Sequence, residues 1–259
     1  MSDRVGIEVE GLRFRYDGMT DDVLRDVDLT VAPAAATAIL GPNGCGKTTL
    51  LSLLLGLNAP QAGSIALAGR AHASYGRAEM SRLLGLVPQS EQFPLGFSVF
   101  DYVLLGRAPF LGLLQRPGDA DLAATEAAIL EVGIGGLMDR PVQELSGGER
   151  QLAMLARALA QQPRGLLMDE PASHLDLGNK QRVIDLIRAQ VARGTTVLIT
   201  THDPNAAARV ADHVVLMRAG QVVAAGPTAQ ALTGEHLTAT YGTPVTVTRL
   251  DGRLIVYVA

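Results

Sequence analysis

The chain carries the run Gly41-Pro42-Asn43-Gly44-Cys45-Gly46-Lys47-Thr48, which fits the pattern G-x-x-x-x-G-K-[ST]. In such a loop, glycines let backbone N–H groups curl around phosphates at the N-terminus of a helix. We expect Lys47 to reach the β- and γ-phosphates of a nucleotide and Thr48 to hold Mg²⁺. Cys45 is expected to offer only its backbone. The nucleotide-binding residues are then Gly41, Pro42, Asn43, Gly44, Cys45, Gly46, Lys47, Thr48 and Thr49.

The sequence around this loop supplies the required context. Residues 36–40 form a short, wholly apolar strand that leads into the loop, and the leucines of residues 48–55 suit a buried helix. Upstream, residues 5–14 and 23–31 alternate apolar and polar, which predicts antiparallel strands with one solvated face. A small β layer followed by a strand, a phosphate loop and a helix is therefore expected.

Downstream, the pattern alternates between strands and helices. Residues 165–168 and 196–200 are short apolar strands, and residues 180–193 between them read as a helix, which indicates a parallel sheet. Apolar positions recur at helical spacing over residues 121–132 and 149–160, so the middle of the chain is predicted to be mostly helical.

The end of the chain predicts a β-hairpin. Residues 245–248 and 254–258 flank a segment that contains Asp251-Gly252, a pair that favours a tight turn.

Two carboxylates follow the apolar strand that ends at Met168. An Asp at such a strand end holds Mg²⁺ in phosphate-loop enzymes, so we assign that role to Asp169. Glu170 is then placed to polarise the water that attacks the γ-phosphate. A strand that simply stops at solvent with two charges is the alternative, and the upstream phosphate loop favours the catalytic interpretation.

Composition excludes several classes of protein. The 259 residues include 47% apolar and 19% charged residues and carry a formal net charge of −4, without a basic stripe, so nucleic acid is not an expected partner. The single cysteine rules out an internal disulfide and suits a reducing cytosol. The longest apolar run, residues 50–57, is under half the roughly 20 residues that a spanning helix needs, and no signal peptide is recognised. A cytoplasmic location is expected.

The run Leu145-Ser146-Gly147-Gly148-Glu149-Arg150-Gln151 resembles the LSGGQ-type signature of ABC ATPases. Ser146, Gly147, Gly148 and Glu149 stand at the start of a helix expected near Glu149, where they would form a second anion site. An ordinary N-cap followed by glycines is the alternative. Since one chain needs one triphosphate site, a second copy of the chain is the expected partner, each copy completing the other's site.

The resemblance extends from residue 5 to about residue 226 and implies further roles. Tyr16 resembles the aromatic residue that stacks on adenine, and Gln89 the glutamine that contacts Mg²⁺ and the attacking water. Ser173-His174-Leu175-Asp176 resembles the loop that crosses the dimer, with Asp176 as its key carboxylate. His202 resembles the histidine that holds the γ-phosphate. The set Glu170, His202, Lys47 and Gln89 is thus expected to be catalytic.

The family's fold is an α/β phosphate-loop NTPase with a RecA-like core, an N-terminal antiparallel β layer and an inserted helical subdomain. We therefore expect an ABC nucleotide-binding domain over residues 1–226, with the helical subdomain at roughly 90–160. Residues 227–259 form a short C-terminal extension. Ala172 departs from the threonine usual in the family, and Glu149 from the commoner glutamine.

Three sequence runs resemble the corresponding runs in ATPases of importers for ferric siderophores, haem and cobalamin. They are the runs 168–171 and 173–179 and the run Val103-Leu104-Leu105-Gly106-Arg107-Ala108-Pro109. The resemblance implies two transmembrane permease subunits, a periplasmic or surface substrate-binding protein acting indirectly, and a peripheral position on the cytoplasmic face of the membrane. Molybdate or tungstate importers, an exporter ATPase and a soluble ABC ATPase of DNA repair or translation are the alternatives.

Residues 92–115 contain five aromatic residues, and the resemblance places four of them in the groove for the permease's coupling helix. These four are Phe93, Phe97, Tyr102 and Phe110. Plain core packing of a helical subdomain is the alternative.

Overall fold

The computed structural model describes residues 4–112, 114–173 and 175–258. Its central sheet has the order β10-β9-β3-β8-β7-β6, in which β10 pairs antiparallel with β9 and the other neighbours are parallel. The strands are β3 (Ala36–Leu40), β6 (Leu84–Val87), β7 (Gly165–Asp169), β8 (Thr196–Thr201), β9 (His213–Arg218) and β10 (Gln221–Pro227). The predicted parallel sheet is confirmed.

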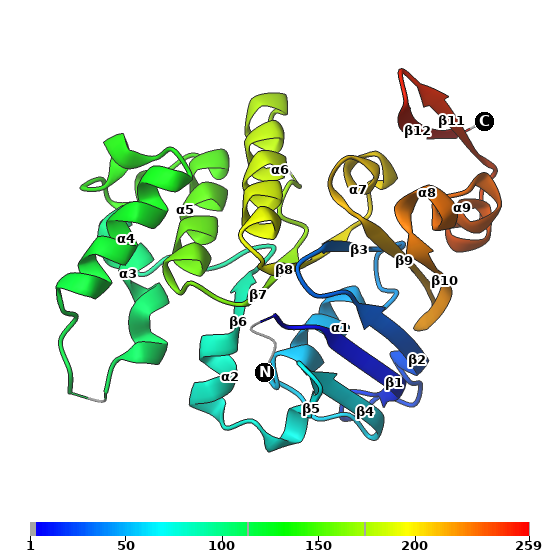
Figure 1. The fold of residues 1–259 in the computed structure, drawn as a ribbon, viewed down its shortest axis with the longest axis horizontal. Helices are drawn as coiled ribbons and strands as arrows, with labels where there is room; N and C mark the ends of the chain where they lie inside the picture. Colours follow the sequence, from blue (N-terminus) through cyan, green and yellow to red (C-terminus); the bar gives the residue numbers. More distant parts are fainter. Residues whose placement is uncertain (1–3, 113, 174, 259) are drawn as a thin grey trace.

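A second, antiparallel sheet has the order β2-β1-β4-β5 and lies beside α1 (Figure 1). Its strands are β1 (Ile7–Phe14), β2 (Leu24–Val31), β4 (Ala62–Leu67) and β5 (Arg70–Ala71). Ile7, Val9 and Leu12 point inward and pack in one cluster with the leucines of α1. The alternation of the sequence thus forms the expected β layer.

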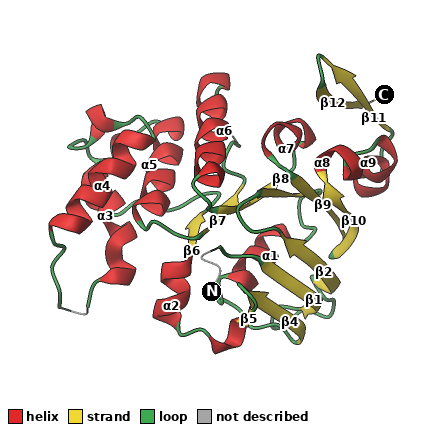
Figure 2. Cartoon of the chain, viewed as in Figure 1, coloured by secondary structure: helices red, strands yellow, loops and turns green. Residues whose placement is uncertain are grey.

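The helices of the middle of the chain gather on one side of the central sheet, away from the antiparallel strands (Figure 2). The α-helices are α1 (Lys47–Leu54), α2 (Arg77–Leu83), α3 (Val99–Leu104), α4 (Asp119–Glu131), α5 (Gly147–Ala160), α6 (Leu177–Ala192), α7 (Pro204–Val210), α8 (Thr228–Ala231) and α9 (Gly234–Tyr241). Short 3₁₀ helices are η1 (His72–Ser74), η2 (Leu105–Phe110), η3 (Gly135–Leu137) and η4 (Val142–Glu144). Within the described ranges, none of the helices has both the length and the apolar character needed to cross a bilayer.

Two helices begin earlier than their apolar periodicity predicts. Helix α5 starts at Gly147 rather than near Glu149, and α6 starts at Leu177 rather than at residue 180. In each case the residue before the helix caps it, because the side chains of Ser146 and Asp176 accept a hydrogen bond from the backbone three residues on.

The C-terminal strands β11 (Val245–Leu250) and β12 (Arg253–Val258) pair as the hairpin that the Asp-Gly turn predicts. Val256 of β12 is buried in a cluster with Ala207 of α7 and Leu237 of α9. The hairpin is therefore fastened to the rest of the chain. The division into two parts at residue 226 stays a prediction.

The aromatic residues of 92–115 serve mainly in packing. Tyr102 is completely buried and its ring centroid lies 4.8 Å from that of Phe93, so the expectation that Tyr102 lines an open groove is wrong. Phe97 packs against the same core, and Phe110 lies beneath the guanidinium of Arg107.

Arg107 joins three elements of the helical region. Its Nε donates to Asp121 Oδ1 of α4 at 2.9 Å, and its Nη1 donates to the carbonyl of Ala160 of α5 at 2.9 Å. The guanidinium also stacks over the Phe110 ring at 4.1 Å. The hydrogen bond from Arg107 holds the pKa of Asp121 below its ordinary value.

We predict that Asp121→Asn lowers the thermal unfolding temperature at pH 7, and that its difference from the parent shrinks as the pH falls. A carboxyl whose pKa is lowered by folding stabilises the fold above its unfolded pKa of about 4, and this contribution is lost as the pH falls through the folded value. Thermal unfolding between pH 7 and pH 3 measures it. Glu126→Gln, at an exposed position of the same helix, is the control. Equal destabilisation by Asp121→Asn at every pH would contradict the ion pair.

Candidate functional site

Three strands of the central sheet end at one place and bring their polar termini together. The Thr48 hydroxyl, just after the phosphate loop, donates to Asp169 Oδ2 at 2.8 Å. Thr200 of β8, which is paired in register with Asp169, donates to the other carboxylate oxygen. Asp169 is thus buried between two hydroxyl groups, which fixes the direction of its side chain.

The phosphate loop is held in a shape that glycine permits. Gly44 and Gly46 have φ values of +79° and +104°, in the left-handed region. A Cβ on Gly46 would lie 2.6 Å from the Leu24 side chain, and one on Gly41 would lie 2.2 Å from the carbonyl oxygen of Met217. The loop is therefore packed too closely against β2 and β9 for larger residues.

Lys47 lies across the mouth of this loop. Its Nζ donates to the carbonyl oxygens of Gly41 and Pro42 at 2.8 and 3.2 Å and lies 3.9 Å from Glu170 Oε1. The neighbouring Cys45 is buried in the core beneath the loop, and burial raises the pKa of its thiol, which favours the protonated form.

Glu170 is held in an unusual conformation directly after β7. Its φ of +50° is left-handed for a residue with a side chain, a state that costs about 1 kcal/mol or more. Its backbone N–H donates to both the carbonyl and the hydroxyl of Thr200, at 3.1 Å each. Strain that neighbouring groups maintain in this way is typical of functional positions.

The Glu170 side chain is paired with His202. The His202 Nδ1 lies 2.5 Å from Glu170 Oε2, and while the glutamate is buried, 57% of the histidine side chain is exposed. The Tyr241 hydroxyl of α9 donates to the backbone carbonyl of His202 at 3.1 Å. Burial raises the pKa of Tyr241, which keeps this donor protonated.

These groups line a cleft of about 330 Å³. The residues around it are Val23, Asn43, Gly44, Gly46, Lys47, Thr48, Thr49, Gln89, Asp169 and Glu170. Tyr16 lies next to it, with its hydroxyl 3.2 Å from Thr49 Oγ1 and its ring edge-on to Phe14. The structure therefore brings together the loop, Gln89 and both carboxylates as the sequence predicts.

The chemistry of the cleft suits a hard cation beside phosphates. In the described part of the chain, three or more His, Cys, Asp or Glu side chains do not gather as a metal site. The available donors are the oxygens of Thr48, Asp169 and Gln89, and a small set of oxygen ligands completed by phosphate and water is typical of Mg²⁺.

The signature residues do not line this cleft. The Ser146 N–H donates to Glu149 Oε2 at 2.8 Å and the Glu149 N–H to Ser146 Oγ at 3.4 Å, a reciprocal cap that lowers the pKa of Glu149. Gly148 is so close to α6 that a Cβ there would lie 2.9 Å from Asn179 Nδ2. Asp176 caps α6 next to it, while His174 lies outside the described residues. Within one chain, these residues form a separate site whose anion-binding role stays a prediction.

Three residues at the site are absent from the sequence-based assignment: Val23, Thr200 and Tyr241. Val23 lines the cleft, and Thr200 and Tyr241 orient Asp169 and His202. The role of Thr200 could have been inferred from the sequence, because it is a polar residue at the end of an apolar strand. Nothing local to Tyr241 points to His202, because 39 positions separate them.

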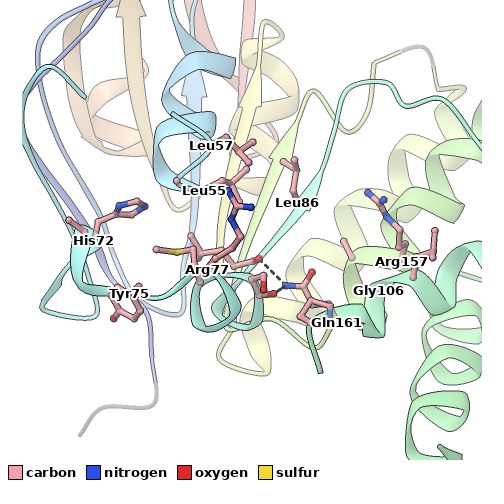
Figure 3. Close-up of a pocket in the computed structure, with 17 residues that line it drawn as sticks. Leu55, Leu57, His72, Tyr75, Arg77, Leu86, Gly106, Arg157 and Gln161 are labelled. Carbon is pink, nitrogen blue, oxygen red and sulfur yellow. Dashed lines mark hydrogen bonds between the residues drawn. The ribbon is translucent and has the colours of Figure 1, made fainter. Parts of the chain in front are cut away.

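A larger groove of about 690 Å³ lies between the end of α1, helix α2, η2 and α5 (Figure 3). Leu55, Leu57 and Leu86 give it apolar surface, and Arg77 and Arg157 add guanidinium groups, that of Arg157 being ion-paired with Glu91 at 2.8 Å. Residues 92–115 supply only Leu105, Gly106 and Pro109 to its lining, and none of the four predicted aromatic residues.

Comparisons with known proteins agree with this geometry. The ABC transporter family model matches residues 24–173. The probable iron chelatin transport ATP-binding protein of Helicobacter pylori is 36% identical over 97% of this chain and 98% of its own length. A zinc transport system ATP-binding protein of Treponema pallidum is 36% identical over 91% of this chain and 86% of its own.

Among solved structures, one described as an inward-facing metal-chelate type ABC transporter superposes with a TM-score of 0.85 at 31% identity, covering 98% of this chain and 97% of that one. The similarity thus includes the C-terminal hairpin as well as the phosphate loop. This chain belongs to the ABC transporter family and has the fold of its ATPase subunits.

Proposed function

We propose that this chain hydrolyses ATP to power import of a metal chelate, a ferric siderophore, haem or cobalamin, through separate membrane subunits. The observation that carries the ATPase assignment is the cleft in which Lys47, Thr48, Asp169 and Glu170 meet. The metal-chelate assignment is supported by end-to-end similarity to an iron chelatin transport protein and to a metal-chelate type transporter.

The phosphate loop binds the nucleotide through its backbone N–H groups and the N-terminus of α1. Lys47 exchanges the carbonyls of Gly41 and Pro42 for phosphate oxygens, so its charge is already in place when ATP arrives. Thr48, Asp169 and Gln89 would hold Mg²⁺, which supplies charge neutralisation at the β- and γ-phosphates. Thr200 keeps the Asp169 carboxylate turned toward Thr48.

Glu170 orients and polarises the attacking water, a role for which its position next to Lys47 in a buried cleft is suited. His202 is hydrogen-bonded to this carboxylate. We expect His202 to exchange the carboxylate for the γ-phosphate when ATP binds, which frees a Glu170 oxygen to accept a proton from water.

A second copy of the chain completes the site. The start of α5 and the Asp176 loop lie together but outside the cleft of their own chain, so two copies that face each other would each offer Ser146, Gly147 and Gly148 to the partner's nucleotide. Contacts with the γ-phosphate across the interface would close the dimer, and hydrolysis would release it.

The membrane partners are two permease subunits, with the chain peripheral on the cytoplasmic face and a substrate-binding protein acting outside. The groove of Figure 3 is the surface that we assign to the permease's coupling helix. It combines apolar residues with Arg77 and Arg157 in the space between α2 and the helices η2 and α5. Residues 1–226 would form the nucleotide-binding domain.

Copurification from solubilised native membranes tests this function. A polytopic partner, together with ATP hydrolysis stimulated by a binding protein loaded with a ferric siderophore, haemin or cobalamin, is the expected result. If ATP hydrolysis is stimulated instead by a binding protein loaded with molybdate or zinc, the transported substrate would be reassigned. Zinc is included because one relative is a zinc transport protein. Ribosomes or DNA in place of a permease would overturn the transport function.

We predict that Glu170→Gln retains ATP binding and lowers the hydrolysis rate by about 100-fold or more, because an amide cannot accept the proton of the attacking water. Nucleotide affinity and steady-state turnover, measured together, separate the two effects, and size-exclusion chromatography with ATP should show a trapped dimer. Hydrolysis at the parent rate would remove Glu170 from this role.

Tyr241→Phe should lower kcat roughly fivefold while KM stays close to the parent value. The reason is that the carbonyl of His202 loses its hydrogen bond from the Tyr241 hydroxyl, so His202 is positioned less firmly. Tyr257→Phe, at an exposed tyrosine of the hairpin, is the matched control and should leave kcat unchanged. An equal effect of the two substitutions would show that the hydroxyl of Tyr241 does not position His202.

A further inference from the structure

A basic cleft lies between α6, α7 and the C-terminal hairpin, elements that lie along the upper edge of the molecule in Figure 1. Its volume is about 350 Å³, and it shares no lining residue with the cleft at the phosphate loop. Four arginines line it, Arg188 from α6, Arg209 from α7, and Arg249 and Arg253 from the hairpin, and no lining residue is an aspartate or glutamate.

Three of these arginines donate hydrogen bonds to neutral groups. Arg188 Nη2 donates to the carbonyl of Arg209 at 2.6 Å, Arg209 donates to the side-chain oxygen of Gln181, and Arg249 Nη1 lies 3.4 Å from the carbonyl of Gly252. Such bonds orient the guanidinium groups of Arg188, Arg209 and Arg249, and among the described residues none of the four arginines forms an ion pair with a carboxylate.

Ion pairs are formed elsewhere in the described part of the chain, by other arginines with their acidic neighbours. Three carboxylates of the described chain stand next to lining residues or their hydrogen-bond partners. Asp185 on α6 accepts a hydrogen bond from Gln181 at 2.7 Å, Asp212 accepts one from the backbone N–H of Ala36 at 2.8 Å, and Asp251 stands in the hairpin turn. None of the three lines the cleft.

Four positive charges that line one cleft favour the binding of an anion. Guanidinium groups bind phosphate in a planar, bidentate geometry, and the local field attracts anions although the chain as a whole carries a net charge of −4. The volume is near the lower end of the roughly 300–1,000 Å³ of small-molecule sites, which suits a compact ligand. We propose that this cleft binds a ligand that presents two or more phosphate groups, either as a free anion or as lipid headgroups, at a site distinct from the ATP site.

The ligand would join parts of the chain that are distant in sequence. The Asn205 side chain of α7 already forms two hydrogen bonds of 2.8 Å with the backbone of Val256 in β12. An anion held by Arg209 on one side and by Arg249 and Arg253 on the other would add a charged link across the same boundary. Since it binds only the folded arrangement, it should raise the unfolding temperature.

Calorimetric titration with pyrophosphate tests the site, using variants to separate it from the phosphate loop, which also accepts this anion. We expect two binding events in the parent chain and one in Lys47→Ala. Adding Arg249→Ala and Arg253→Ala to Lys47→Ala should weaken the remaining event by about tenfold for each guanidinium removed. Added salt should weaken it further.

Two controls make the result specific. Arg116→Ala, at an exposed arginine in the loop before α4, should leave the second event unchanged when added to Lys47→Ala. Arg249→Ala with Arg253→Ala in the chain that retains Lys47 should hydrolyse ATP at the parent rate, which shows that the variant is folded.

The outcomes distinguish the sources of the phosphate groups. Pyrophosphate binding that depends on Arg249 and Arg253 supports a free anion. Binding of Lys47→Ala to phosphatidylglycerol vesicles, with the same dependence but no pyrophosphate binding, places the phosphates on lipid headgroups. A single pyrophosphate site that Lys47→Ala abolishes, without vesicle binding, overturns the proposal.

Discussion

The carboxylate of Asp169, held between the hydroxyls of Thr48 and Thr200, is the interaction on which the site depends. It is possible only because β3, β8 and β7 are parallel neighbours, so that their carboxyl ends meet at one edge of the sheet. The phosphate loop follows the first strand, Thr200 stands near the end of the second, and both acidic residues end the third. In a sheet with a different strand order, the carboxylate of Asp169 would not lie beside the phosphate loop.

Other parts of the fold form hydrogen bonds that support this edge of the central sheet. The turn between β9 and β10 supports the phosphate loop, since the N–H of Gly220 donates to the carbonyl of Cys45 and its carbonyl accepts from the N–H of Arg25. The antiparallel sheet therefore contacts the loop through the same turn. At the other side, Tyr241 and the Asn205–Val256 pair tie the C-terminal residues to the segment that carries His202. The C-terminal part is thus linked to the segment of the Glu170–His202 pair by hydrogen bonds between side chains and the backbone.

Local patterns predicted much of this arrangement. The loop, the two carboxylates and the strand before each were found because glycine, lysine and aspartate at fixed spacing have a direct chemical meaning. The β layer and the final hairpin followed from alternation and from an Asp-Gly turn. The predicted first residues of α5 and α6 were less accurate. Ser146 and Asp176 cap these helices, and the apolar periodicity of a sequence gives no information about caps. The short strands β4, β5, β6, β9 and β10 were not predicted, although they complete the two sheets.

By itself, the sequence determined that this chain folds around a phosphate loop and which acidic residues serve it, because that chemistry is encoded in contiguous residues. Only the tertiary structure decided which distant side chains orient these groups. Thr200 reaches Asp169, Tyr241 reaches His202, and four arginines from two helices and a hairpin converge on one cleft, through contacts between residues that are far apart in sequence. Tyr102, which could have lined a groove, is buried in the core instead. The direction of an aromatic side chain depends on what packs against it, and this is set by the assembled helices rather than by neighbouring residues in the chain.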